Sequence, residues 1–93
     1  MVKIIWTSKS FNDLESIFEY IAKDSKKYAS IQVRMIKDRT KQIKLNPLSG
    51  RVVPEFNDVN LRELIEGNYR IAYLIKSENV FILTIHHSAR LIS

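Results

Sequence analysis

Three arginines could act together on a phosphate in this sequence. Arg62, Arg70 and Arg90 fall near the ends of neighbouring apolar runs in the C-terminal half of the chain. A guanidinium group binds phosphate oxygens through paired hydrogen bonds, so three of them at strand ends would form a phosphate clamp. The simpler interpretation is structural. A lone arginine inside a strand is commonly paired with an acid across the sheet, and for Arg70 that acid would be Glu63 or Glu66.

Two histidines and one glutamate are candidates for proton transfer. His86 and His87 end the last apolar run, and Glu55 lies in the segment GRVVPEF. A histidine titrates near neutral pH and can act as general acid or base, or it can simply hydrogen-bond to backbone. Neighbouring strand residues point to opposite faces, which argues against a two-histidine metal site. Glu55 could accept a proton from a nucleophile, or neutralise Arg51.

Other catalytic signatures are absent from the sequence. It contains no metal-ligand pattern, glycine-rich phosphate loop, dinucleotide fingerprint or nucleophile elbow. We therefore expect neither a metal nor a cofactor.

Strands must position these side chains. The β-branched and aromatic segment 2–7 predicts a first strand, and 51–56 predicts a short one. Three further strands are predicted over 61–66, 69–76 and 79–87, joined by two-residue turns at Gly67-Asn68 and Ser77-Glu78.

Two helices are predicted between the first strand and the others. Ser8 or Ser10 caps the first helix, which runs to about Lys23 with an apolar stripe at helical spacing. The second begins after Ser25 and stops at Asn46, before Pro47. Its buried face is Ala29, Val33, Ile36, Thr40 and Ile43, and it carries seven of the fifteen basic residues. The short connection predicts an antiparallel helical hairpin.

The last hairpin predicts which face of the sheet the helices cover. A two-residue turn at Ser77-Glu78 places Ile75 opposite Val80, Tyr73 opposite Ile82 and Ile71 opposite Thr84. The more apolar face, and the predicted site of helix packing, is then Arg70, Ala72, Leu74, Phe81, Leu83, Ile85 and His87. Arg62 falls on the Tyr73 face with a two-residue turn at Gly67-Asn68, or with Arg70 if that turn is bulged.

Composition places the chain among ordinary globular proteins. Its 93 residues suffice for one domain, 1–93, and the content is 45% hydrophobic and 27% charged. The expected fold class is α+β, with the helical hairpin packed on one face of a mainly antiparallel, curved sheet. No apolar run is long enough to span a bilayer, and with no cysteine a cytoplasmic location is expected. The net charge of +5 favours an acidic partner.

Four segments together resemble the toxins of the RelE/ParE superfamily of bacterial type II toxin–antitoxin systems. They are FNDLESIFEYIAKDS, LNPLSGRVVPEF, LRELIEGNYRIAYLI and VFILTIHHSARLI, and they cover nearly the whole chain. The resemblance implies a growth-inhibitory toxin that a cognate antitoxin wraps and neutralises, with operator DNA contacted only through the antitoxin. It implies either of two targets: RelE-like members cut mRNA on the ribosome without a metal, and ParE-like members inhibit DNA gyrase.

The resemblance also assigns roles to the candidate residues in case the protein is a ribonuclease. Arg70 matches the strand arginine that contacts phosphate, Arg62 matches a basic residue on the preceding strand, and Arg90 matches one after the last strand. His87 lies near the catalytic histidine of another branch, and Glu55 resembles that branch's loop glutamate. The C-terminal tyrosine of many RelE-like nucleases is missing, and the ending HHSAR is more ParE-like. The resemblance therefore favours gyrase slightly.

Overall fold

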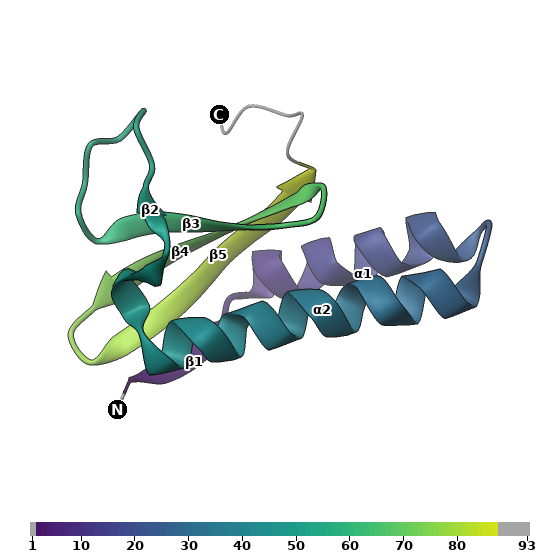
Figure 1. Cartoon of the computed structure of the whole chain (residues 1–93), viewed down its shortest axis with the longest axis horizontal. Helices are drawn as coiled ribbons and strands as arrows, with labels where there is room; N and C mark the ends of the chain where they lie inside the picture. Colours follow the sequence, from purple (N-terminus) through teal and green to yellow (C-terminus); the bar gives the residue numbers. More distant parts are fainter. Residues whose placement is uncertain (1, 88–93) are drawn as a thin grey trace.

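The computed structural model describes residues 2–87, so Arg90 lies outside the described residues. One five-stranded sheet has the order β1-β5-β4-β3-β2, and two helices pack on one of its faces (Figure 1). The elements are β1 (Lys3–Trp6), α1 (Ser8–Ala22), α2 (Lys26–Leu45), the 3-10 turn η1 (Pro47–Ser49), β2 (Arg51–Val52), β3 (Leu61–Glu66), β4 (Tyr69–Lys76) and β5 (Asn79–His87). The predicted α+β class is confirmed.

The sheet is antiparallel except at one edge. β1 runs parallel to β5, and the β2–β3, β3–β4 and β4–β5 pairs are antiparallel. Strands β3, β4 and β5 have the predicted bounds, and both turns hold two residues, with Gly67 at φ +59°. β2 is shorter than the predicted 51–56, because Pro54 has no N–H to donate to a ladder and the chain turns there.

The helices have the predicted extents, with one correction at the start of α1. The N-cap is Thr7, whose side chain accepts a hydrogen bond from the Ser10 amide, rather than Ser8 or Ser10. Ser10 is instead buried, with its hydroxyl donating to the Thr7 carbonyl at 2.8 Å. Ser25 caps α2 and Asn46 ends it, as predicted. No helix within residues 2–87 has the length and apolar character that crossing a bilayer requires.

The helices cover the face of the sheet opposite to the predicted one. The core joins Leu14 and Ile17 of α1 and Ile36 and Ile43 of α2 to Leu64, Ile71, Tyr73, Val80, Ile82 and Ile85 of the sheet. The predicted face carries Arg70 in the middle of the sheet, and packing a helix over it would bury that charge away from water. The face that lacks helices is called the open face below.

A β-bulge at Leu83 explains why the end of β5 does not follow the predicted alternation of faces. Tyr73 pairs with Ile82 as predicted, but Ala72 pairs with Thr84, which leaves Leu83 as the extra residue. Beyond the bulge every side chain of β5 points to the face opposite to the one that a regular strand would give it. Ile71 therefore pairs with Ile85 rather than with Thr84. Ile85 therefore joins the core.

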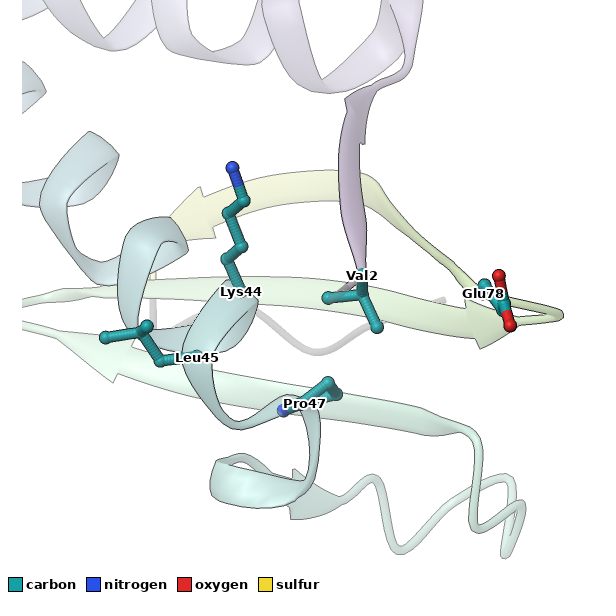
Figure 2. A pocket seen from close by; sticks show the side chains of 5 residues that line it. All are labelled: Val2, Lys44, Leu45, Pro47 and Glu78. Carbon is teal, nitrogen blue, oxygen red and sulfur yellow. The ribbon is translucent and has the colours of Figure 1, made fainter.

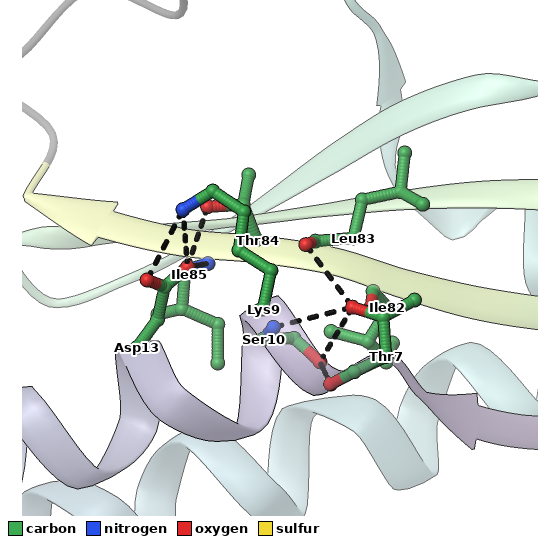
Figure 3. A network of polar contacts seen from close by, with 8 residues as sticks. All are labelled: Thr7, Lys9, Ser10, Asp13, Ile82, Leu83, Thr84 and Ile85. Carbon is green, nitrogen blue, oxygen red and sulfur yellow. Dashed lines mark hydrogen bonds and ion pairs between the residues drawn. The ribbon is translucent and has the colours of Figure 1, made fainter.

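The N-cap residue Thr7 and Asp13 of α1 hold β5 at this bulge through their side chains (Figure 3). β1 ends opposite Ile82, so the next residues of β5 have no strand on that side. Thr7 donates to the Ile82 carbonyl at 2.7 Å. The Asp13 carboxylate accepts from the Thr84 hydroxyl at 2.6 Å and from the Ile85 amide at 3.1 Å. The start of α1 thus takes the place of the missing strand.

Asp13→Ala is expected to lower the free energy of unfolding by about 1–3 kcal/mol, because it leaves the half-buried Ile85 amide and Thr84 hydroxyl without an acceptor. Urea denaturation measures the loss. Lys9→Ala is the control: its ammonium pairs with Asp13 at 3.2 Å but is 69% exposed, so its removal should have little effect. Equal losses in the two variants would contradict the assigned role of Asp13.

Candidate functional site

The open face carries a row of polar side chains across four strands. Arg51 of β2 lies opposite Glu63 of β3, and Arg70 of β4 lies opposite His86 of β5. These four residues are called the open-face cluster. It contains only one of the predicted arginines, and it contains His86 where the sequence predicted His87. The bulge at Leu83 is the reason, since it exchanges the faces to which the two histidines point.

Glu63 is the centre of the open-face cluster. Its side chain is fully buried, and one carboxylate oxygen accepts from Arg51 at 2.7 Å from Nε and 2.6 Å from Nη2. Its other oxygen lies 3.7 Å from Arg70 Nη1. The predicted simple role of Arg70, a cross-strand pair with Glu63, is therefore confirmed. Two guanidiniums thus lie against one buried carboxyl group, and each offers positive charge to compensate it.

The imidazole of His86 adds a neutral group beside these charges. Burial lowers the pKa of His86 from its usual 6.5, and the Arg70 guanidinium lowers it further, against smaller raising effects of Glu63 and Asp13. His86 Nε2, Arg70 Nε and Glu63 Oε2 are all buried without a hydrogen-bond partner among residues 2–87. The cluster therefore has unused donors and acceptors at its centre.

Acid is expected to destabilise the fold through His86. The pKa of His86 is lower in the folded protein than the ordinary 6.5, so its contribution to stability is complete above about pH 6.5 and is lost as the pH falls through the folded value. Protonation would add a third cation to Arg51 and Arg70, with Lys9 also nearby.

Urea midpoints measured from pH 7.5 down to pH 5 test this. His86→Gln should flatten that part of the pH profile. An unchanged profile in His86→Gln would contradict the prediction.

Arg62 lies on the face that the helices cover. It pairs with Tyr73 across the ladder, so the two-residue-turn alternative for its placement is correct. Its Nε donates to the Val59 carbonyl at 2.8 Å, and its Nη1 donates to the carbonyls of Gly50 at 2.8 Å and Leu48 at 3.3 Å. The structure therefore places Arg62 and Arg70 on opposite faces of the sheet and does not join them in one clamp. Arg90 lies outside the described residues.

The other two candidates lie apart from the cluster. Glu55 is exposed in the loop between β2 and β3. Arg51, which Glu55 could have neutralised, pairs with Glu63 instead. The His87 ring meets the edge of the Tyr69 ring at a centroid distance of 5.6 Å and an angle of 76°. Neither residue adjoins Arg70 in the ladder.

Among the described residues no arginine lines either of two hollows, although His86 of the open-face cluster lines the second. One of about 350 Å³ lies between the end of α2, the start of β1 and the β4–β5 turn, and is lined by Val2, Lys44, Leu45, Pro47 and Glu78 (Figure 2). Another of about 840 Å³ lies between α1 and the end of β5, where Asp13, Tyr20, Tyr69 and both histidines line it. Within residues 2–87 no group of three or more histidine, aspartate or glutamate side chains could hold a metal ion.

The sequence did not predict that Glu63 lies at the centre of the cluster, or that His86 rather than His87 lies beside Arg70. Glu63 was available as one of two acids that could reach Arg70. Its pairing with Arg51 depends on the β2–β3 register, which no turn motif of the loop indicates. The histidine exchange depends on the bulge.

Comparisons with known proteins agree with this fold. A chain of the chromosomal ParDE TA system from P. aeruginosa has a TM-score of 0.78 at 23% identity, covering 94% of this chain and 96% of that one. The YoeB/ParE toxin from Agrobacterium tumefaciens has a TM-score of 0.65 at 16% identity, covering 92% and 98%. The YoeB dimer from Staphylococcus aureus has a TM-score of 0.56 at 18% identity, covering 89% and 92%. The TM-scores show that these proteins share the fold of this chain, and at identities below 25% the likeness shows the fold alone.

The family comparison goes further. A search of curated protein sequences finds no match. The family model for the ParE toxin of the type II toxin–antitoxin system parDE, however, matches residues 4–92, nearly the whole chain. The ordered segments that resembled these toxins in the sequence are thus part of one continuous match, and the chain belongs to the ParE toxin family of type II toxin–antitoxin systems.

Proposed function

We propose that this protein is a cytoplasmic toxin that a cognate antitoxin neutralises, and that it acts by binding DNA gyrase rather than by cutting RNA. The observation that carries the choice of target is the separation of Arg62 and Arg70. A ribonuclease that stabilises a pentavalent phosphate needs its cations around one point. Here Arg62 donates to three backbone carbonyls and Arg70 faces the other side of the sheet.

Exposed aromatic side chains on the helical hairpin supply a surface for binding a protein. The hairpin projects beyond the sheet (Figure 1), and Tyr20 and Tyr28 on either side of its connection are 72% and 68% exposed. Tyrosines that the fold leaves uncovered are typical anchors of protein interfaces. We infer that these two tyrosines contact the target.

A supercoiling assay with purified gyrase and an assay on mRNA-programmed ribosomes, run side by side, test the proposal. The protein should inhibit supercoiling and leave mRNA intact. The double variant Tyr20→Ala/Tyr28→Ala should need at least about tenfold more protein for the same inhibition, as expected when interface anchors are removed. Phe11→Ala, another exposed aromatic of α1, is the matched control. Cleaved mRNA together with unaffected supercoiling would refute the proposal.

One observation favours a second candidate, a metal-independent mRNA endonuclease. Arg70 and the neutral His86 face each other on the open face, and a guanidinium beside an imidazole is a pair that can bind phosphate and move a proton. In that case His86→Gln should abolish mRNA cleavage while the fold persists. Unchanged cleavage in this variant would exclude His86 from the chemistry.

A further inference from the structure

The outward flank of α2 carries a row of cations that the fold does not use. Its members are Lys26, Lys27, Arg34, Lys37, Lys41 and Lys44, all exposed. These six residues are called the basic stripe. The remaining basic residue of α2, Arg39, belongs to the other flank, where it donates to the Ile65 carbonyl at 2.9 Å and lies 3.6 Å from Glu66.

Helix geometry gathers the basic stripe into a straight band. At about 3.6 residues per turn the six positions fall within an arc of about 100°, centred roughly 120° from the buried line of the helix. That buried line is Ala29, Ile36, Thr40 and Ile43. From Lys26 to Lys44 the band extends over about 27 Å, at about 1.5 Å per residue.

Little of this charge is compensated. Among residues 2–87 the ion pair that involves the stripe joins Lys41 to Asp38 at 3.6 Å, and both side chains are largely exposed. An exposed pair of this kind contributes little. The band therefore presents a nearly uniform positive potential to solvent.

The composition of the band decides between classes of partner. Between Lys26 and Lys44 the arc holds Ser30 and no apolar or aromatic side chain. Protein interfaces are depleted in lysine and depend on buried aromatic or apolar anchors, and single-stranded nucleic acids need aromatic rings on which to stack. The exposed Tyr28 and Met35 lie on the other flank of the helix. What remains is the backbone of a duplex, a stiff rod with phosphates at fixed spacing.

We propose that the basic stripe binds the phosphodiester backbone of duplex DNA, without reading its sequence. The choice of DNA rests on the proposed function, because gyrase holds duplex DNA and a toxin that acts on it meets that duplex. The stripe would then supply phosphate contacts while the tyrosines of the hairpin contact protein. Lysines contribute to such binding mainly by releasing counterions, so the affinity depends steeply on salt.

Fluorescence anisotropy of a labelled duplex, with the purified protein and no gyrase, tests the stripe over a series of salt concentrations. The triple variant Arg34→Gln/Lys37→Gln/Lys41→Gln should flatten the slope of log affinity against log salt by up to about 2.7, at about 0.9 for each phosphate that is no longer neutralised. The control triple Lys3→Gln/Lys23→Gln/Lys76→Gln removes the same charge from exposed lysines elsewhere, and its slope should stay near that of the wild type. Circular dichroism confirms that both variants are folded.

Two results would overturn the proposal: equal loss in the two triple variants, which indicates a diffuse effect of net charge, or tighter binding to the single strand than to the duplex. The supercoiling assay separates this proposal from the function on which it rests. Duplex binding that depends on the stripe, without gyrase inhibition, supports the stripe and refutes the gyrase target. Gyrase inhibition together with an equal loss of duplex binding in both triple variants supports the gyrase target and refutes the role of the stripe.

Discussion

Glu63→Gln is expected to lower the free energy of unfolding by about 3 kcal/mol, the largest loss we expect from a single substitution in this protein. The amide has nearly the size of the carboxylate but no charge, so the variant isolates the electrostatic role. The Arg51 side chain is 58% exposed and can turn toward water. The Arg70 side chain is only 20% exposed, so it stays beside the neutral amide and its own charge is left uncompensated. The loss should therefore come mainly from Arg70.

Urea or guanidinium denaturation at pH 7 measures this loss, with Glu55→Gln as the control. Glu55 is exposed in a loop, so its variant should remain within about 0.5 kcal/mol of the wild type. Adding Arg70→Gln to Glu63→Gln should recover part of the stability, because it removes the unpaired charge. A loss below about 1 kcal/mol for Glu63→Gln, or no recovery in the double variant, would contradict a charge-compensating role for Glu63.

Gly50→Ala should cost almost as much, about 3 kcal/mol, at the upper end of what overpacking costs in a protein core. A methyl group at Gly50 would lie 2.5 Å from the Tyr73 hydroxyl oxygen and 2.7 Å from the Glu63 carbonyl oxygen. The hydroxyl cannot simply move, because it accepts from the Gly50 amide at 2.9 Å and donates to the Pro47 carbonyl at 2.7 Å. Tyr73 is fully buried, and burial raises the pKa of its phenol, which therefore remains a donor.

Gly67→Ala provides the contrast for this measurement. A methyl group there would meet only Gln32, at 3.8 Å, so its cost of about 1 kcal/mol comes from the positive φ of +59°. The thermal midpoint of Gly50→Ala should thus fall well below that of Gly67→Ala. The reverse order would show that the space around Gly50 relaxes and that Tyr73 does not hold η1 against the sheet.

Local interactions explain how much of the fold the sequence predicted. The cap at Ser25, the stop before Pro47 and the turns at Gly67 and Ser77 depend on residues a few positions apart, and the structure confirms each of them. The bounds of β3, β4 and β5 follow from these turns. The pairing of Arg70 with Glu63 followed only in part, because the sequence left Glu66 as the alternative acid and left the Gly67-Asn68 turn open between two residues and a bulge.

Residues far apart in the chain decided the rest. The Ile85 amide bonds to Asp13 across 72 positions, and the bulge that this contact holds determines that His86 rather than His87 lies beside Arg70. Arg51 reaches Glu63 only through the β2–β3 pairing. The sequence by itself determined the order of the elements, the cap of α2 and a membership that the family match confirms. Only the tertiary structure decided which face of the sheet is open and which charged groups meet there, because a shift of one residue in a strand reverses every side chain beyond it.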